Sequence, residues 1–441
     1  MEKNIFIFDQ NKCVGCHACV IACMNENGFQ STGLWRNIYK SDNLHLPTLP
    51  LFYLSLACNH CDDAPCLKNC PSLAYSRDEV TSAVIHHPEK CIGCKYCTWA
   101  CPYDAPKYNP KEGIIEKCTF CNPRIEEELK PACAHLCPVG ALDFINTEFS
   151  REESAESSPV DVNVGSKIKI KTIRKESGPE IDLKLFEDQP IESTKEKQYK
   201  KISARDEWPL IIFTLLSATL VSLYASGITE PFNSIHKHTY IGFGAFATIL
   251  SMLHLGKKNR FWRSLLNFKN SWLSREILFF ALFLTGVFCE FYLFDLPNLF
   301  VSAISLLLLF SIDMLYYIAT WKWSLKIHSA QTVLSGLTLF AVFTGWNYLF
   351  VFIMSFRLTI YIYRKFTINH KNHFVSVFRI TLALAATILL FINQNFLFII
   401  GLIAIAEIID RIEFYNELKV SDPEEEIQNK PSNKQRNYAT T

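Results

Sequence analysis

Four cysteines lie within eleven residues near the start of the sequence. Residues 13–23 read CVGCHACVIAC, with Cys13, Cys16, Cys19 and Cys23 in the spacing C-x2-C-x2-C-x3-C. Three thiolates at this short step can converge on one face of a soft metal cluster, and the fourth then projects past it. The stretch therefore predicts ligands for an iron-sulfur cluster.

Three more quartets follow, so that sixteen of the seventeen cysteines belong to such a group. In bacterial ferredoxins with two clusters, the fourth cysteine of one run ligates the cluster held by the first three of the other run. Four runs therefore predict four [4Fe-4S] clusters, although the spacing alone leaves open which runs are partners. The further quartets are Cys58, Cys61, Cys66 and Cys70, then Cys91, Cys94, Cys97 and Cys101, then Cys118, Cys121, Cys133 and Cys137.

Two other uses of cysteine compete with this interpretation. A disulfide framework needs an oxidising compartment, and the start MEKNIFIFDQNKC shows neither a basic, apolar signal segment nor a twin arginine. Zinc ribbons use two C-x2-C pairs about 15 to 20 residues apart, and they do not need a third thiolate at the same step. Iron-sulfur ligation explains the repeated quartets better than either.

The elements that must position these cysteines occupy only the first part of the chain. All four quartets precede residue 140, and from about residue 208 the sequence consists of long apolar runs rich in Phe, Leu and Ile. We expect an α+β, ferredoxin-like domain with four clusters over residues 1–149 and an all-α bundle of eight transmembrane helices over 207–415. A disordered tail would follow over 416–441. The formal net charge is only +1, which argues against a nucleic-acid partner.

The segment between the two parts, residues 150–206, is dense in charge of both signs and poor in aromatic residues. The simplest interpretation is a charged linker. The alternative is that its stretch VNVGSKIKIKTI forms an arm that lies on a partner protein.

Eight apolar runs of about 17 to 24 residues are long enough to cross a hydrocarbon core of roughly 30 Å as helices. Several tryptophans fall at or near their ends, as expected for an interfacial aromatic belt. The expected spans cover residues 208–226, 238–255, 277–294, 297–320, 328–344, 346–363, 374–393 and 395–413. The tryptophans are Trp208, Trp262, Trp272, Trp321, Trp323 and Trp346.

Charge at the span ends predicts the orientation. With eight spans, the cluster domain and the even-numbered loops share one side, and Lys and Arg in short loops are retained in the cytoplasm. The opposite loops contribute only Lys237. We therefore expect a multi-pass protein of the bacterial inner membrane with its clusters on the cytoplasmic face. The basic residues on the cluster side are Lys195, Lys197, Lys200, Lys201, Arg205, Lys257, Lys258, Arg260, Arg263, Lys269, Arg275, Lys322, Lys326, Arg364, Lys365 and Lys371.

A chain of one-electron carriers in a membrane protein suggests exchange with a quinone. His254, at the cluster-side end of the second span, is the first candidate to accept a proton from quinol, and the alternative is an interfacial histidine bonded to a neighbouring helix. Further ionisable residues within the spans either contact quinone or neutralise one another: Asp313, Arg357, Glu407 and Asp410 on the cluster side, and Glu290 toward the other. Only His254 is clearly within a span, so a haem with two axial histidines is not expected.

Several motifs in the sequence resemble those of one known protein family. The stretches LACNHCDDAPCLKNCPSLA, KCIGCKYCTWACPYDAPKYN and KPACAHLCPVGALDF closely resemble the four-cluster electron-transfer subunit of dimethyl sulfoxide and polysulfide reductases. LHLGKKNRFWRSLLNFKNSWLSREIL and AEIIDRIEFY are similar to the eight-span membrane anchor of dimethyl sulfoxide reductase. The family usually makes these two subunits as separate chains, whereas here they are fused.

The resemblance implies that the first run is paired with the fourth and the second with the third. The implied ligand sets are Cys13, Cys16, Cys19 and Cys137; Cys118, Cys121, Cys133 and Cys23; Cys58, Cys61, Cys66 and Cys101; and Cys91, Cys94, Cys97 and Cys70. Some relatives have an aromatic residue in place of a third-run cysteine and hold a three-iron cluster, but Cys94 is present here.

The resemblance also implies a function. The chain would oxidise menaquinol from the quinone pool and relay the electrons through four [4Fe-4S] clusters to a separate, molybdopterin-containing catalytic subunit in anaerobic respiration. No glycine-rich dinucleotide motif or nucleophile-base group appears in the sequence, in agreement with an active site on another chain. The alternatives are electron flow from a substrate dehydrogenase to quinone, and a metal-stabilised membrane scaffold without enzymatic activity.

Overall fold

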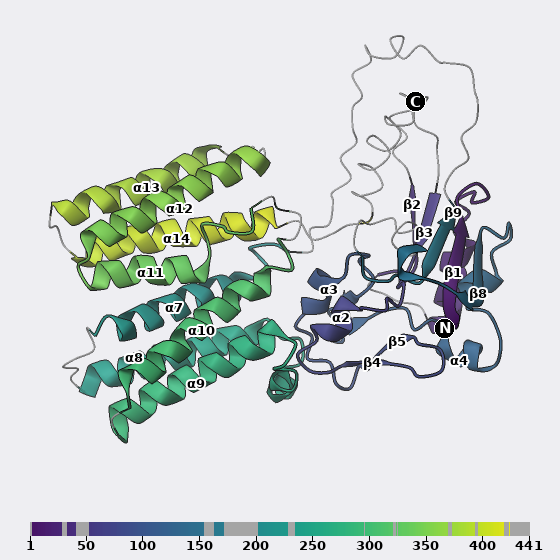
Figure 1. The fold of residues 1–441 in the computed structure, drawn as a ribbon, viewed down its shortest axis with the longest axis horizontal. Coiled ribbons are helices and arrows are strands. Elements are labelled where there is room, and N and C mark those ends of the chain that lie inside the picture. Colours follow the sequence, from purple (N-terminus) through teal and green to yellow (C-terminus); the bar gives the residue numbers. More distant parts are fainter. Residues whose placement is uncertain are drawn as a thin grey trace, which may run out of the picture. The chain divides into compact units, whose positions relative to one another are not determined.

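The computed structural model describes residues 2–28, 33–40, 53–153, 163–171, 202–227, 234–294, 296–320, 323, 325–368, 373–392, 396–418 and 423. The chain divides into two compact units, one of residues 1–199 with 420–441 and the other of residues 200–419. The first unit contains the four cysteine quartets and the second contains the apolar runs (Figure 1).

The first unit is built on a three-stranded sheet in the order β8-β1-β9. Strand β1 (Glu2–Asp9) pairs antiparallel with β8 (Leu142–Glu148) and parallel with β9 (Ile168–Lys171). Its second half, Ile5 to Phe8, is continuously apolar, and Ile5, Phe6 and Phe8 are buried. Phe6 contacts the rings of Phe120 and Phe144. A continuous apolar run is what a strand paired on both sides in the middle of a sheet requires.

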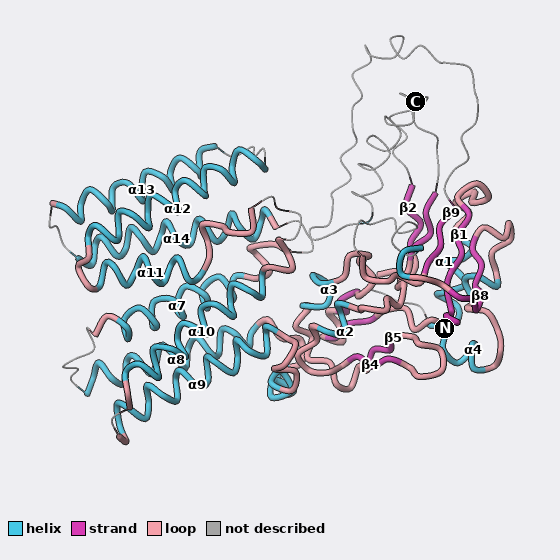
Figure 2. The backbone as a smooth tube through the Cα atoms, viewed as in Figure 1, coloured by secondary structure: helices cyan, strands magenta, loops and turns pink. Residues whose placement is uncertain are grey.

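Short hairpins and one- to three-turn helices complete the first unit, which is the α+β iron-sulfur domain that the sequence predicted (Figure 2). The hairpins join β2 (Asn37–Lys40) to β3 (Tyr53–Leu56), β4 (Tyr75–Arg77) to β5 (Val84–His86), and β6 (Lys107–Asn109) to β7 (Ile114–Glu116). The helices are α1 (Ala18–Asn27), α2 (Pro65–Lys68), α3 (Tyr96–Ala100), α4 (Asn122–Glu126) and α5 (Ala132–His135).

Part of the expected linker belongs to this first unit, which corrects the sequence interpretation. Residues 163–171 run along the domain: Asp62 N–H donates to the Gly165 carbonyl at 2.8 Å, and β9 completes the central sheet. The alternation in KIKIK suits a strand whose Ile168 is buried. The preceding Lys167 is also buried, and its ammonium donates to the Ser82 carbonyl at 2.9 Å. The expected arm is thus paired with β1 of its own chain. Residues 154–162, 172–201 and most of the expected tail lie outside the described residues.

The second unit contains eight α-helices among its described residues, one in each of the eight expected spans (Figure 1). They are α7 (Trp208–Ala225), α8 (Ser234–Leu253), α9 (Trp272–Tyr292), α10 (Asn298–Tyr316), α11 (Thr332–Phe343), α12 (Asn347–Ile368), α13 (His373–Phe391) and α14 (Phe396–Glu417). A 3-10 helix, η3 (Lys258–Leu265), follows α8 at an angle of 102°.

The eight helices form two groups of four consecutive elements. Helices α7 to α10 pack around one another, α11 to α14 pack in sequence, and α11 and α14 both contact α7. Within the described residues, four helices are long and apolar enough to cross a membrane, and α8 with η3 makes a fifth if the bent pair is one span. Helix α11 is short, and α12 and α14 carry buried charged residues.

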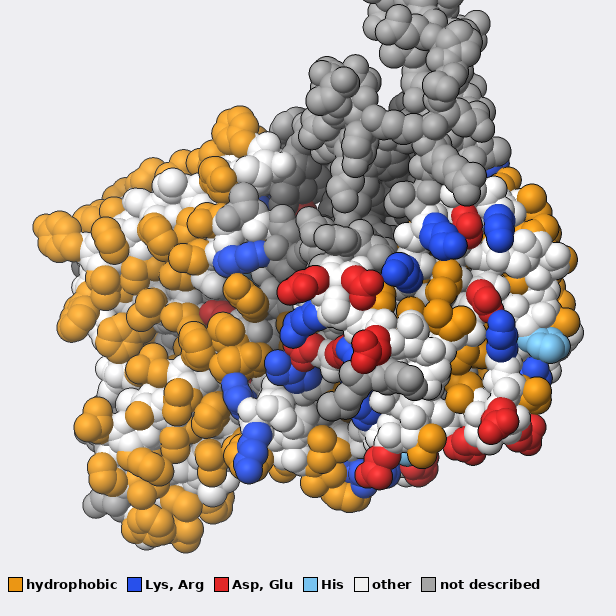
Figure 3. Space-filling model, turned by 45° about the vertical axis from the view of Figure 1, so that its right-hand side comes forward, with side chains coloured by type: hydrophobic (Ala, Val, Ile, Leu, Met, Phe, Trp, Pro, Cys, Tyr) orange, Lys and Arg blue, Asp and Glu red, His pale blue; other side chains and the backbone are white. Residues whose placement is uncertain are grey.

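Hydrophobic side chains cover the face of the helical unit seen in Figure 3, which is what contact with lipid tails requires. The tryptophans lie near helix ends as expected: Trp208 and Trp272 begin α7 and α9, and Trp346 directly precedes α12. Trp321 lies outside the described residues.

Candidate iron-sulfur and quinol sites

The first and third quartets fold alike around their second cysteine. Gly15 and His17 flank Cys16 with φ of 69° and 61°, and the corresponding Gly93 and Lys95 have φ of 70° and 59°. These left-handed residues reverse the chain just before α1 and α3 begin. A side chain at Gly15 would bring its Cβ within 2.6 Å of the Tyr53 ring, so only glycine fits there.

The structure brings thiols from the first and fourth quartets together. Burial raises the pKa of the Cys13 thiol, and the neighbouring thiols of Cys19 and Cys137 raise it further. Cys23, one turn along α1 from Cys19, has other neighbours: burial and the thiols of Cys133 and Cys121 raise its pKa to about 12. The Asn27 amide lies 3.7 Å from the Cys23 sulfur and 3.9 Å from the Cys121 sulfur, which places these two quartets side by side.

The second and third quartets also lie together, and each contributes one thiol to the group formed by the other. Burial raises the pKa of Cys61, and the thiols of Cys58 and Cys101 add to this effect. In the other set, burial raises the pKa of Cys94, and Cys70 is the neighbouring thiol with the largest effect. The neighbouring thiols group in the same way as the four ligand sets that the family resemblance implied, and their role as cluster ligands stays a prediction.

The environment of the sulfur atoms fits a multi-iron cluster. Backbone N–H groups of Gly93, Phe120 and Leu142 each lie 3.4 Å from a cysteine sulfur, as donors to a thiolate ligand would. In the described part of the chain, no three His, Cys, Asp or Glu side chains converge closely enough to hold a single metal ion.

We number the four sets in the order in which the resemblance gave them: the first contains Cys13, the second Cys118, the third Cys58 and the fourth Cys91. Contacts between the thiols of neighbouring sets place the sets in a linear series. Cys19 of the first set interacts with Cys133 of the second, and Cys118 of the second with Cys58 of the third. Tyr75 is buried between Cys97 of the fourth set and Cys66 of the third.

Burial follows this order. All eight cysteines of the two middle sets are buried, whereas Cys16 in the first set is exposed and Cys94 in the last is half-buried. Both ends of the series thus lie nearer the surface than its middle.

In the helical unit, His254 lies half-buried in the turn between α8 and η3. This is where the backbone turns by 102°. Both α8 and η3 pack against α9, so the histidine sits among elements that form one end of the first helix group.

Glu276, which lies just after the first turn of α9, was missed by the sequence interpretation because it directly precedes the expected span. It is 4% exposed, and the structure gives it no ion pair with a described residue. It interacts with Tyr316 and Tyr415, whose hydroxyls are hydrogen-bonded to each other. A buried carboxyl group that lacks a cationic partner among the described residues is a candidate for exchanging a proton with quinol.

The other candidates named from the sequence have local roles in the structure. Asp313 accepts hydrogen bonds from the backbone N–H groups of Thr332 and Val333 and so caps the start of α11. Glu290 accepts a hydrogen bond from the Tyr224 hydroxyl near the opposite end of α9.

Arg357, Glu407 and Asp410 belong to a buried ionic network, which is the neutralisation that the sequence left as an alternative. Arg357 and Arg411 both pair with Glu407. Asp410 accepts from Arg364 and Arg379 at 2.9 Å each, and also from the Ser329 hydroxyl. The network ties α12, α13 and α14 to the segment that precedes α11.

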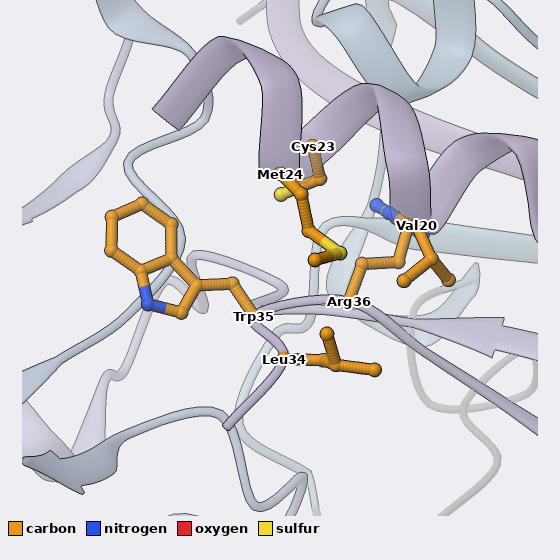
Figure 4. Close-up of a pocket in the computed structure, with 6 residues that line it drawn as sticks. All are labelled: Val20, Cys23, Met24, Leu34, Trp35 and Arg36. Atoms are coloured by element: carbon orange, nitrogen blue, oxygen red, sulfur yellow. The ribbon is translucent and has the colours of Figure 1, made fainter. Parts of the chain in front are cut away.

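A small hollow opens beside Cys23, between α1 and the segment that leads into β2 (Figure 4). Its lining includes Met24, Trp35 and Arg36. Figure 4 shows the Cys23 sulfur and the Met24 thioether on the same side of α1, with the Arg36 side chain extending toward that helix.

Four sets of four thiols in an α+β domain, joined to an apolar helix bundle, define an iron-sulfur electron-transfer protein with a membrane anchor. Residues 49–147 match the family described as a 4Fe-4S dicluster domain, and residues 203–409 match the DMSO reductase anchor subunit (DmsC).

The first part of the sequence is similar to one component of the anaerobic dimethyl sulfoxide reductases. The Haemophilus influenzae protein is 36% identical over 177 residues, which cover 37% of this chain and 86% of the relative. The Escherichia coli protein is 40% identical over 163 residues, which cover 35% and 79%. A component of the sulfite dehydrogenase of Allochromatium vinosum is 33% identical over 165 residues, which cover 33% and 69%. This protein belongs to the dimethyl sulfoxide reductase family and joins the family's iron-sulfur subunit to its membrane anchor.

Proposed function

We propose that this chain oxidises menaquinol in the membrane and passes the electrons through four [4Fe-4S] clusters to a separate, molybdopterin-containing catalytic subunit. The observation that carries the proposal is the crossed grouping of sixteen cysteines into four sets within a chain that also contains the anchor. When bound, the clusters supply one-electron carriers, and the linear order of the sets provides a path with an exchange site at each end.

The cysteines would hold the clusters as follows. The first set is Cys13, Cys16, Cys19 and Cys137; the second is Cys118, Cys121, Cys133 and Cys23; the third is Cys58, Cys61, Cys66 and Cys101; the fourth is Cys91, Cys94, Cys97 and Cys70. The exposure of Cys16 favours the first set as the site of exchange with another protein.

Quinol oxidation releases two electrons and two protons, so the helical unit must supply a proton acceptor. His254 would accept the proton of the quinol hydroxyl or position that hydroxyl, and Glu276 would hold a proton in the same region. Both residues lie at the helix ends that carry the excess of Lys and Arg. Retention of these basic residues in the cytoplasm would place the clusters and the proton release on that face of the inner membrane.

Two alternative functions can be tested by experiment, namely electron flow from a substrate to quinone and a membrane scaffold without enzymatic activity. The similarity to a sulfite dehydrogenase component favours testing the opposite direction, from a substrate through the clusters to quinone. Cluster potentials above that of menaquinone would support flow toward the clusters, and potentials below it would support the reverse.

The decisive experiment is purification of the chain with its bound partner. Iron and acid-labile sulfide should each reach about sixteen per chain, because each of four clusters contains four of each. Clusters should be reduced by a menaquinol analogue, and the partner should contain molybdopterin. Bound zinc without sulfide would overturn the proposal and support a membrane scaffold.

A further inference from the structure

Arg36 is a buried cation without a carboxylate partner among the described residues. It is 1% exposed and is one of the largest fully buried side chains. Its Nη1 donates to the Ser55 hydroxyl at 3.0 Å, but Nε and Nη2 are buried and meet no hydrogen-bond acceptor in the described part of the chain. The guanidinium also lies 4.7 Å from the centre of the Phe6 ring. An uncompensated buried charge of this kind is costly.

Within the described ranges, Arg36 is surrounded by cysteine thiols, which would be thiolates once they ligate iron. The Ser55 hydroxyl that accepts from Arg36 is also 3.4 Å from the sulfur of Cys19, which belongs to the first set. The electrostatic neighbours of the guanidinium come from two sets, Cys19 from the first and Cys133, Cys118 and Cys23 from the second. Arg36 therefore lies at the junction between two neighbouring clusters.

A second buried cation occupies the next junction. The ammonium of Lys117 lies 3.6 Å from the sulfur of Cys58 in the third set and donates to the carbonyl of Cys118 in the second at 2.8 Å. Lys117 is 2% exposed and has no carboxylate partner among the residues that the structure describes. Each of these two junctions thus contains one buried positive charge.

We propose that Arg36 is a redox-tuning residue, which raises the reduction potentials of the first and second clusters together. Its Nε–H and Nη2–H groups would donate to cluster sulfur, and its charge would stabilise whichever cluster holds the transferred electron. Hydrogen bonds to sulfur and nearby net charge are two established determinants of cluster potential. As one cluster loses an electron, the other gains it, and the arginine transfers no proton.

The inference rests on the proposed ligand sets. It predicts that the two buried cations affect different but overlapping pairs of clusters. Removing the charge at Arg36 should lower the potentials of the first and second clusters, whereas removing it at Lys117 should lower those of the second and third. Neither change should move the fourth cluster. The second cluster is the one that both variants share.

The test is a redox titration of the full chain, followed by low-temperature EPR, with cysteine-to-serine ligand variants to assign each signal. Arg36→Met should lower the ratio of reduced to oxidised first and second clusters about tenfold at a fixed potential, which is about 59 mV for a one-electron couple. Arg36→Lys retains the charge and should restore most of the shift. Lys111→Met, at an exposed position between β6 and β7 and seven residues from the nearest cysteine in the sequence, is the matched control and should leave all four potentials unchanged.

Iron and sulfide content separates the outcomes. If the unmodified chain lacks the four clusters, the proposed function fails. If the clusters are present but their potentials are unchanged in Arg36→Met, or all four shift equally, the inference alone is overturned. Should Arg36→Met fail to assemble, Arg36→Gln and Lys117→Met still test it. A Lys117→Met variant that shifts the first cluster and not the third would contradict the assignment of the junctions.

Discussion

The thiols of Cys66 and Cys101 belong to one set although they come from different quartets. Cys101 follows Cys97 by four residues, but it is the extended residue that ends helix α3, with φ of −82° and ψ of 118°. The chain leaves the helix at this point, and the thiol of Cys101 is carried away from Cys97 toward the second quartet. The end of α3 therefore provides a structural reason for the crossed ligation that we propose.

Replacing Cys101 with Ser should damage the cluster of the third set and spare the cluster held by Cys91, Cys94 and Cys97. Low-temperature EPR with iron analysis measures both. Cys289, on α9, is the matched control, and Cys289→Ser should retain all four clusters. Loss of the cluster held by Cys91, Cys94 and Cys97, with the other intact, would show that the quartets are not exchanged.

His254→Ala should leave the four clusters assembled and reducible by dithionite. Reduction by a menaquinol analogue should slow by roughly 100-fold or more, which is the scale of losing a positioned acid-base group. Stopped-flow measurement of cluster reduction tests this, and reduction at the normal rate would exclude the histidine from quinol oxidation. Proton release on the face opposite the clusters would instead contradict the orientation of the site.

Glu276→Gln retains the shape of the side chain but removes its ability to take up a proton as a carboxylate. We expect quinol-driven reduction to slow by about tenfold or more, with cluster content unchanged. Glu290→Gln is the matched control, because Glu290 lies on the same helix near its other end and bonds to Tyr224. Equal effects of the two substitutions would show that the helix needs these acidic side chains for stability alone.

Asp410→Ala should destabilise the helical unit by about 3 to 5 kcal/mol, because it leaves Arg364 and Arg379 buried without their shared anion. Thermal unfolding of the purified chain in detergent, followed by helical circular dichroism, measures the change. Asp206→Ala, at an exposed position, serves as the control. Similar unfolding temperatures for both variants would show that the network adds little stability.

We expect His86 to make the stability of the iron-sulfur domain sensitive to acid. Burial, with the nearby Lys117 and His87, lowers the pKa of His86 from 6.5 to about 3. The unfolded chain therefore takes up a proton that the folded chain refuses between these values. Stability is complete above pH 6.5 and falls by up to about 1.4 kcal/mol per pH unit below it.

The temperature at which the visible cluster absorbance is lost, compared at pH 7 and pH 5, tests this contribution. His86→Gln should show a smaller decrease than the unmodified chain, because glutamine does not titrate. An unchanged decrease would assign the acid sensitivity to other groups.

The sequence was sufficient where a local pattern determines the structure. Cysteine spacing predicted the quartets, and apolar run length predicted a helix in each of eight places. It was insufficient where a role depends on distant contacts. Ile168 looked like part of a charged linker, yet it is buried beside β1 because long-range pairing outweighs local composition.

Single residues without a motif were the hardest to interpret. Glu276 stands one position before an apolar run, and only the packing of α9 shows that it is buried. Arg36 occurs in the ordinary stretch GLWRNIYK, and nothing in that stretch indicates that four thiols from two sets surround it.

The nested grouping of the thiols has a consequence for biosynthesis. The last thiol of the third and fourth sets is Cys101, whereas the first and second sets must wait for Cys137 and Cys133. A polypeptide is made from its N-terminus, so Cys13 and Cys16 emerge first. The set to which they belong is nevertheless the last to be completed, because it also needs Cys137. Cluster delivery in the cell should therefore proceed from the inner pair of quartets to the outer pair. A nascent chain whose Cys101, but not Cys133, has left the ribosome should hold only the third and fourth clusters.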